Sequence, residues 1–450
     1  MKSYDIIVVG ASAAGLTAAI TARRHYPQKS IMVIRKEKLI PIPCGIPYAF
    51  GQVGTPDKNL IPADKALQKN NIDDVIGKAI DIDRKNHIIK IESGEGFVYK
   101  KFIIATGSNP MIPPIPGTDI EGVFAIHKDV PYLKEVIKAV DKANSVTIIG
   151  CGFIGVEIAE ECRRRCPDIE INIVEMLSHC LQLTYDTEFS EKAEEVLRKQ
   201  NIILELDETV SEIVGNGKVE KLKLKSGREI KTDFVILGIG AVANTELAEK
   251  SGLEIGPGKG VLVNHYMKTN DEDIFACGDC AEKFSFFDGK TCNMKLASIA
   301  TTEARIAGAN LFANRRINHG VIGVYSTVLG DECFAAAGLT TAHAKKKGIE
   351  VITGDSEGLN RHPGCMPGAA RMRVKLLFEA ATKRIVGGQV TGAKSGGELI
   401  NAISACIQQK MTADDIATFQ TGTHPALTAS PIAYQLVNAA EMAIIKMREN

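Results

Sequence analysis

The chain has 450 residues, of which 45% are hydrophobic and 24% charged, a composition typical of a globular protein with more than one domain. Lysine plus arginine and aspartate plus glutamate each number 54, so the formal net charge is zero. This balance argues against a nucleic acid or an anionic membrane surface as partner. No stretch reaches the roughly 18 apolar residues of a membrane helix, and no leader peptide precedes the first strand pattern.

The cysteines bear on the redox compartment. There are 11 of them, an odd number, and they are scattered through apolar stretches. In a chain of this length that pattern indicates reduced thiols and no disulfide framework. We therefore expect a cytoplasmic protein.

One signature occurs twice in the chain. Residues 6–15 and 145–155 each combine an apolar strand, a glycine turn and a helix start, and further apolar strands follow at 30–34 and 169–174. Strand, glycine turn, helix and strand form the unit that binds a dinucleotide, because free N–H groups at the helix start face the pyrophosphate. We predict two such sites. The expected contact residues are Gly10, Ser12, Ala13, Ala14 and Gly15 in the first and Gly150, Gly152, Phe153, Ile154 and Gly155 in the second.

The remaining predicted elements follow in chain order. A strand over 101–109 contains the turn Ala105-Thr106-Gly107, and a proline-rich linker spans 110–116. Later strands end near Gly240 and at Gly278-Asp279, and an alanine-rich helix covers 296–311. From about 323 the pattern changes to alternating strands such as 373–378, followed by helices over 396–409 and 429–447. This last part is predicted to be an α+β domain.

In combination these motifs resemble the flavin-dependent pyridine nucleotide–disulfide oxidoreductases, over essentially the whole chain. The segment 43–48, Pro-Cys-Gly-Ile-Pro-Tyr, is similar to the single-cysteine branch, which includes coenzyme A-disulfide reductases, NADH-dependent persulfide or sulfur reductases and NADH oxidases. The resemblance implies an α/β protein with two Rossmann-like domains and a C-terminal α+β dimerisation domain, hence a homodimer. The expected boundaries are 1–113 and 245–322 for the FAD domain, 114–244 for the NAD domain and 323–450 for dimerisation.

The first glycine signature departs from the usual pattern. Ser12 replaces the middle glycine, and Arg35 stands where an acid about 20 residues further on would hold a ribose hydroxyl. Ribose contact then falls to Glu37 or to backbone. The resemblance implies that Asp279 binds the ribityl chain of FAD. The other expected contacts of this site are Arg35, Ala105, Thr106, Gly107, Gly278 and Ala297.

The second signature has all three glycines, and Glu175 lies about 20 residues beyond the last. A carboxylate there accepts a hydrogen bond from a 2′-hydroxyl and repels a 2′-phosphate, which favours NADH over NADPH. Glu157 resembles the family's glutamate near the nicotinamide; its alternative role is an acid at a helix N-terminus. Gly240 is expected near the same cofactor.

Cys44 is the leading catalytic candidate. The resemblance places its loop over the flavin, where a thiolate accepts electrons. No second cysteine occurs in 45–50, so the oxidised form must be a mixed disulfide, a persulfide or a sulfenic acid.

Two further residues are weaker candidates. Cys365 lies in the loop 361–368, where coenzyme A-disulfide reductases carry a tyrosine that is absent here; it is either a second active thiol or a packed loop cysteine. His424-Pro425 resembles the acid–base histidine that a partner subunit supplies, although Ala429 replaces the orienting glutamate, so His424 is either catalytic or an interface residue.

The other cysteines are expected to pack without binding metal. Cys277 and Cys280 overlap the flavin turn, Cys162 and Cys166 flank an arginine run, and Cys151 fills a variable position of the glycine turn. Three functions compete. The first is an NADH-dependent reductase of a small disulfide, persulfide or polysulfide, with coenzyme A as possible substrate or ligand. The second is an NADH oxidase, and the third is the reductase of a protein electron carrier or a flavoprotein binding module.

Overall fold

The computed structural model describes residues 1–449. The chain forms two compact units: unit 1 comprises 1–114, 124–142 and 239–321, and unit 2 comprises 115–123, 143–238 and 322 onward. The chain crosses between the units several times, and strand β8 (Val123–Ala125) lies at one crossing. The three-domain boundaries expected from the sequence are finer than this division and stay a prediction.

Unit 1 is built on a seven-stranded sheet of order β3-β2-β1-β6-β5-β4, in which β17 also pairs with β6. Its central strand β1 (Lys2–Val9) runs parallel to β2 (Ile31–Arg35) and β6 (Gly96–Ile104). Residues 6–9 of β1 are buried, as expected of a parallel strand that is covered on both faces. The other strands of the unit are β3 (Asp73–Ile76), β4 (Ala79–Asp83), β5 (Ile88–Ile91), β17 (Ile274–Ala276) and the separate pair β7 (Ser108–Pro110) and β16 (Ala241–Ala243).

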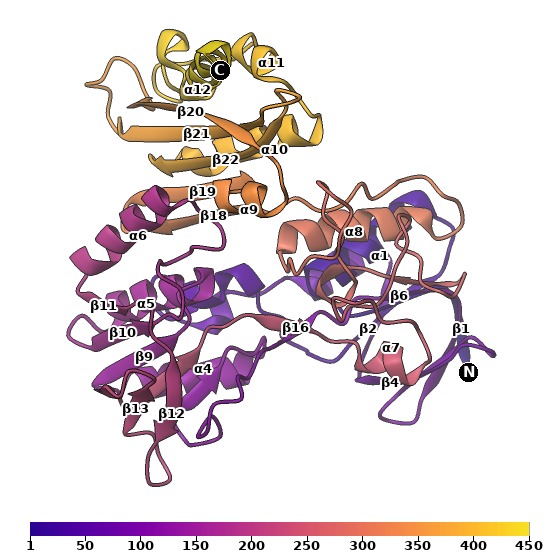
Figure 1. Cartoon of the computed structure of the whole chain (residues 1–450). Helices are drawn as coiled ribbons and strands as arrows, with labels where there is room; N and C mark the ends of the chain where they lie inside the picture. Colours follow the sequence, from indigo (N-terminus) through magenta and orange to yellow (C-terminus); the bar gives the residue numbers. More distant parts are fainter. Residues whose placement is uncertain (450) are drawn as a thin grey trace. The chain divides into compact units, whose positions relative to one another are not determined.

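Two alanine-rich helices of unit 1, α1 (Ala13–His25) and α8 (Ala297–Asn310), lie side by side (Figure 1). They approach closely because Gly308 faces the backbone of Ala18, where any side chain would overlap. The remaining helices and turns of this unit are η1 (Pro43–Gly45), α2 (Ile46–Ala49), η2 (Pro56–Lys58), α3 (Ala63–Lys69), α4 (Val130–Val140), α7 (Glu246–Lys250) and η3 (Gly278–Cys280).

The N-terminal part of unit 2 repeats the parallel arrangement. Strands β11 (Ile202–Glu205), β10 (Glu170–Val174), β9 (Ser145–Ile149) and β15 (Phe234–Leu237) pair in that order and in parallel. Both predicted strand–glycine turn–helix units are therefore present, and the predicted α/β class is confirmed. Helices α5 (Phe153–Arg165) and α6 (Thr187–Lys199) and the small antiparallel sheet β12 (Val210–Val214), β13 (Lys221–Leu224) and β14 (Glu229–Lys231) complete this part.

The C-terminal part of unit 2 is an antiparallel sheet of order β18-β19-β22-β21-β20, which confirms the predicted α+β pattern. Helix α12 (Gln435–Glu449) lies against β20 (Figure 1), where Gly354 leaves room for the Ala439 carbonyl. It begins later than the predicted residue 429 because Pro431 starts the turn η4 (Pro431–Ala433). The other elements are β18 (Val324–Leu329), β19 (Glu332–Gly338), α9 (Thr341–Lys346), β20 (Val351–Leu359), β21 (Arg371–Glu379), β22 (Ile385–Gly392), α10 (Gly396–Gln408) and α11 (Ala413–Ala417).

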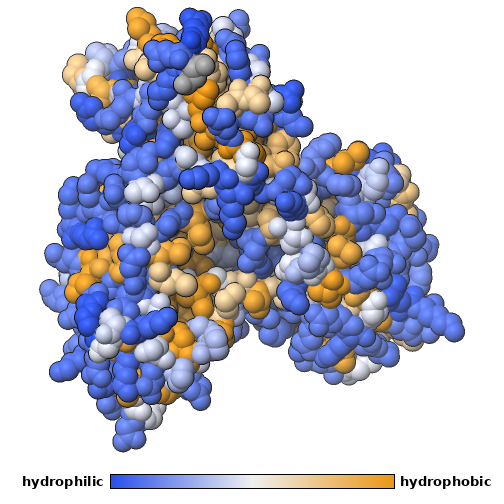
Figure 2. Space-filling view, viewed as in Figure 1, coloured by the Kyte–Doolittle hydropathy of each residue, from blue (hydrophilic) through white to orange (hydrophobic). Residues whose placement is uncertain are grey.

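Hydrophilic residues cover most of the face drawn in Figure 2, with hydrophobic residues scattered among them. Within residues 1–449, no helix combines the length and the apolar character needed to cross a membrane.

Candidate active site

In unit 1, the turn after β1 forms a backbone cradle. Gly10 has a φ of +104°, and a side chain there would overlap the carbonyl of Ala105. Gly15 approaches the Gly10 carbonyl just as closely. The predicted turn at Ala105 therefore lies against the first glycine signature. Ser12 is the N-cap of α1 and makes no side-chain capping bond, which leaves the first N–H groups of the helix open toward an anion. This arrangement fits a dinucleotide pyrophosphate.

Arg35, at the end of β2, is already engaged by protein groups. Its side chain is 5% exposed and contacts Asp64 at 2.5 Å and Asp74 at 2.6 Å. It also donates to the Lys38 carbonyl at 3.0 Å. The guanidinium therefore fixes the chain that follows β2, and its predicted contact with FAD stays a prediction.

The predicted flavin residue Asp279 lies in η3, directly after β17. Its carboxylate accepts hydrogen bonds from the Ser108 hydroxyl at 2.7 Å and from the Lys128 ammonium at 3.3 Å. Sequence reasoning missed both partners. Ser108 follows the Ala105–Gly107 turn directly, and this position could have indicated a contact with Asp279. No motif in the sequence indicated Lys128. The Thr106 hydroxyl donates to the Asn244 carbonyl at 2.7 Å.

Beneath η3 lies a buried ion pair that the sequence analysis also missed. Lys283 and Glu303 are 5% and 1% exposed and 2.9 Å apart. Glu303 accepts the Gly278 N–H at 2.9 Å, while Lys283 donates to the carbonyls of Gly278 and Ala281 at 2.6 and 2.8 Å. Burial raises the pKa of Glu303, and the nearby positive charge of Lys283 opposes this rise. The pair holds the turn that presents Asp279.

Cys44 lies on the exposed turn η1 of the same unit. Asn59, which is buried, anchors this turn: its side chain donates to the Ile42 carbonyl at 2.9 Å, and its own carbonyl accepts the Ile42 N–H at 2.9 Å. Gly45 packs on the Asn59 amide so closely that a side chain would overlap it. The loop that carries the thiol is thus held at a defined position.

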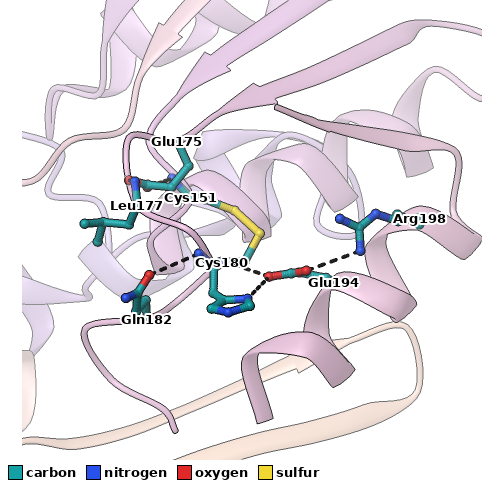
Figure 3. Close-up of a disulfide and its surroundings, with 8 residues drawn as sticks. Cys151, Glu175, Leu177, Cys180, Gln182, Glu194 and Arg198 are labelled. Carbon is teal, nitrogen blue, oxygen red and sulfur yellow. Dashed lines mark hydrogen bonds and ion pairs between the residues drawn. A yellow bond between two sulfur atoms is a disulfide. The ribbon is translucent and has the colours of Figure 1, made fainter. Parts of the chain in front are cut away.

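In unit 2, the second glycine turn and Glu175 come together as predicted. Both oxygens of Glu175 accept backbone N–H groups, one from Cys151 in the glycine turn at 2.7 Å and one from Leu177 at 2.9 Å (Figure 3). Gly155 packs on the carbonyl of Gly150, and Gly152 is the N-cap of α5. The carboxylate is thereby fixed beside the turn, a place suited to a ribose hydroxyl.

The structure corrects the expectation that all cysteines are reduced. Cys151 and Cys180 form a disulfide (Figure 3). Sequence spacing could not reveal the pair, because the two cysteines are 29 positions apart and only the folding of the loop after β10 brings Cys180 to the glycine turn. Cys277 and Cys280 are buried thiols.

Glu157, on α5, is partly buried and accepts a hydrogen bond from the Thr327 hydroxyl at 2.7 Å. Burial raises its pKa to about 7, assisted by the like charges of Glu160 and Glu161. One turn earlier, the ring of Phe153 stacks on Tyr325 with centroids 5.3 Å apart. The C-terminal sheet therefore contributes Thr327 and Tyr325 to the start of α5, which motif reading did not anticipate.

The loops of Cys365 and His424 are brought together within unit 2. The His362 N–H donates to the Pro425 carbonyl at 3.3 Å, and both Cys365 and His424 are exposed. His424 Nδ1 accepts the Ala426 N–H at 3.2 Å, which places the proton of the neutral ring on Nε2. Alanine at 429 leaves that position without the carboxylate that would orient the histidine. The catalytic roles of both residues stay predictions.

Two backbone cradles, each at the end of a parallel strand and each with its own carboxylate, define an oxidoreductase that binds two dinucleotides. The chain belongs to the pyridine nucleotide-disulphide oxidoreductase family: the family model matches residues 4–304, and the model of the family's dimerisation domain matches 324–432. It is a flavoprotein of the class that uses FAD and a nicotinamide dinucleotide.

Three relatives illustrate the similarity. An NADH oxidase of Methanocaldococcus jannaschii is 31% identical over 98% of this chain and 99% of that protein. A CoA-dependent NAD(P)H sulfur oxidoreductase of Pyrococcus furiosus is 29% identical over 92% of this chain and 94% of that protein. The solved structure of an NAD-dependent persulfide reductase from A. fulgidus superposes with a TM-score of 0.91 at 30% identity, covering 99% of this chain and 84% of that one.

Proposed function

We propose that this protein takes hydride from NADH through FAD and passes the electrons, by way of Cys44, to a small disulfide, persulfide or polysulfide. The observation that carries this proposal is the exposed Cys44 thiol on a firmly anchored turn, without a second cysteine in residues 45–50. A lone cysteine cannot form an internal disulfide, so in this proposal it completes its redox cycle with a sulfur atom of the substrate. The sulfur and persulfide reductases among the relatives support this reading.

The proposed chemistry balances as a two-electron reduction. FAD, when bound, accepts hydride from NADH and returns two electrons. The Cys44 thiolate attacks one sulfur of the substrate, the substrate S–S bond breaks, and the first thiolate leaves. Two electrons then cleave the mixed disulfide, which restores the Cys44 thiolate and releases the second thiolate. Coenzyme A is a candidate thiol carrier, since the P. furiosus relative is named as CoA-dependent.

NADH is the proposed donor. Glu175 is held beside the second glycine turn by two backbone N–H groups, so its negative charge faces the place of the adenine ribose. A 2′-phosphate at that position would meet this charge at close range, and no Arg or Lys occurs in 176–181 to offset it.

Reduction of oxygen or peroxide is the second candidate function. The M. jannaschii relative, which matches nearly the whole chain, is named an NADH oxidase. In that case peroxide would oxidise Cys44 to a sulfenic acid, which two further electrons reduce to the thiolate with release of water.

The deciding experiment is steady-state consumption of NADH with a panel of acceptors, in air and without oxygen. We expect turnover without oxygen on coenzyme A disulfide, coenzyme A persulfide or polysulfide, and its loss in Cys44→Ser. Turnover with oxygen alone would instead establish the oxidase. Turnover of a protein electron carrier by both the wild type and Cys44→Ser would establish the carrier reductase.

A further inference from the structure

The disulfide joins two segments of the second dinucleotide site. Cys151 lies in the glycine turn between β9 and α5, and Cys180 lies in the loop that follows β10 (Figure 3). Both side chains are buried, at 1% and 0% exposure. The bond therefore sits inside the contact between the turn and the loop, next to the carboxylate of Glu175.

The same turn and loop are also connected by hydrogen bonds. The Cys151 N–H donates to Glu175 at 2.7 Å, and the Leu181 N–H donates back to the Cys151 carbonyl at 2.9 Å. The disulfide thus constrains the spacing between the backbone that would receive the pyrophosphate and the carboxylate that would receive the ribose. Any change in the disulfide acts directly on that spacing.

Each cysteine has its own anchor apart from the disulfide. The Cys180 N–H donates to Glu194 of α6 at 3.2 Å, and the same carboxylate contacts His179 at 3.0 Å and Arg198 at 3.2 Å (Figure 3). Cys151 remains at the start of α5. Breaking the S–S bond would therefore leave two folded segments, one held by α6 and the other by α5, joined by the hydrogen bonds of Cys151 with Glu175 and Leu181 but no longer by a covalent bond.

The loop covers residues 175–186 between β10 and α6. Met176 and Leu183 are each 69% exposed, whereas Cys180, Leu181 and Tyr185 are buried. Surface segments open locally without global unfolding, at a free-energy cost set by the buried side chains that they withdraw. A small dithiol can reach the S–S bond during such an opening.

We propose that Cys151 and Cys180 form a thiol–disulfide couple that sets the affinity of the second site for its nicotinamide dinucleotide. The inference rests on the proposed function only in assigning that ligand. In the disulfide state the turn and Glu175 are pre-organised for binding; in the dithiol state the covalent constraint between turn and loop is lost and binding weakens. A dithiol reductant supplies two electrons and two protons, so that one S–S bond breaks in the protein and one forms in the reductant. A disulfide or polysulfide reverses the exchange.

The test uses the FAD-loaded protein in a Cys44→Ser background, so that the redox state of Cys44 plays no part. The protein is incubated with polysulfide or with dithiothreitol, the reagent is removed, and thiols are alkylated in denaturant before peptide mass spectrometry. Binding of NAD⁺ to the folded protein is measured by calorimetry in both states. We expect a cross-linked 151–180 peptide only in the oxidised sample and a dissociation constant on the order of tenfold higher after dithiol treatment.

Two variants separate the couple from general effects of thiols. Cys180→Ala should bind NAD⁺ as weakly as the reduced protein and should not respond to dithiol. Cys162→Ala is the matched control: Cys162 is a buried thiol of the neighbouring helix outside the disulfide, and this variant should keep the full response.

Three results would overturn the inference: alkylation of both cysteines after polysulfide treatment, survival of the cross-link in dithiothreitol under native conditions, or equal NAD⁺ affinity in the two states. Failure of the ligand assignment, the one point taken from the proposed function, looks different. The oxidised protein would then bind no NAD⁺ at all, with the cross-link intact.

Discussion

We expect a single residue, Glu175, to govern the choice between NADH and NADPH. Replacing Glu175 by Ala removes the charge that is expected to face the ribose, so the preference for NADH over NADPH should fall. Each tenfold loss of preference corresponds to a free-energy difference of about 1.4 kcal/mol. The ratio of kcat/KM for the two cofactors measures this. Glu170→Ala, which alters an exposed residue at the start of the strand that precedes Glu175, is the control that should leave the ratio unchanged. Equal use of both cofactors by the wild type would refute our interpretation of Glu175.

Cys44 is the second residue on which the proposed function depends, through its thiol. In Cys44→Ser, reduction of disulfide, persulfide or polysulfide should fall to background, because a hydroxyl does not form the mixed disulfide. FAD content and the rapid bleaching of flavin absorbance by NADH should persist. Cys365→Ser is the parallel variant, and full activity there would reduce Cys365 to a loop residue. Wild-type acceptor reduction by Cys44→Ser would remove the thiol relay.

Glu157 gives a pH dependence with a definite sign. Its pKa is raised from 4.5 to about 7 in the folded protein, so the folded protein binds the proton of this carboxyl more tightly than the unfolded chain does. The contribution to stability is present in full below pH 4.5 and is lost as the pH rises through 7, by on the order of 1 to 3 kcal/mol. Melting temperatures of the wild type should therefore fall more between pH 6 and 8 than those of Glu157→Gln. Parallel curves would show that the carboxyl is not perturbed.

At the scale of single residues, chain-local patterns predicted the positions of two acidic groups, whose roles toward the cofactors stay predictions. Glu175 and Asp279 each follow a buried strand at a fixed spacing, and the structure places each beside its predicted turn. The disulfide partner Cys180 and the hydroxyl of Thr327 escaped detection because they arrive from distant parts of the chain. Glu303 did leave a signal. It is a charged residue on the buried alanine face of α8, and such a residue requires a buried partner.

The turn η3 depends on the buried ion pair of Lys283 and Glu303. Lys283 and Glu303 hold the carbonyl and N–H groups of Gly278, so removing one member leaves a buried charge unpaired. Lys283→Met should accelerate the release of FAD, measured as flavin fluorescence after dilution, and lower the melting temperature. The double variant Lys283→Met with Glu303→Leu should recover part of the stability. An unchanged rate of FAD release in Lys283→Met would mean that η3 keeps its conformation without the Lys283–Glu303 ion pair.

Strands and helices with clear periodicity were predicted nearly to the residue. The strand expected at 373–378 forms the centre of β21, and the helix expected at 396–409 is α10. Errors occurred at ends that a turn decides, as at Pro431, where a 3-10 turn precedes α12. The periodicity of hydrophobic residues shows where a helix or strand lies, whereas the residue at which it begins depends on the local turn.

For the whole molecule, the family's dimerisation domain at 324–432 predicts a homodimer of 48.5 kDa subunits. The surface of this part of the chain carries large apolar side chains: Phe419, Leu427 and Ile432 are 37%, 69% and 88% exposed. Exposed apolar side chains close together in the sequence are suited to burial against a second subunit. A dimer interface would also explain why His424, between two of them, is exposed within one chain.

Ile432→Asp should therefore weaken the dimer, because burying an unpaired carboxylate in an apolar interface is unfavourable. We expect light scattering at micromolar concentration to shift from two subunits toward one. Ile76→Asp, which alters an exposed isoleucine of unit 1 (51% exposed), is the control and should remain dimeric. If the partner subunit supplies His424, the monomeric variant should lose acceptor reduction while retaining FAD and flavin reduction by NADH. A monomeric variant with full acceptor reduction would show that each subunit works alone, and a monomeric wild type would remove the C-terminal domain from the mechanism.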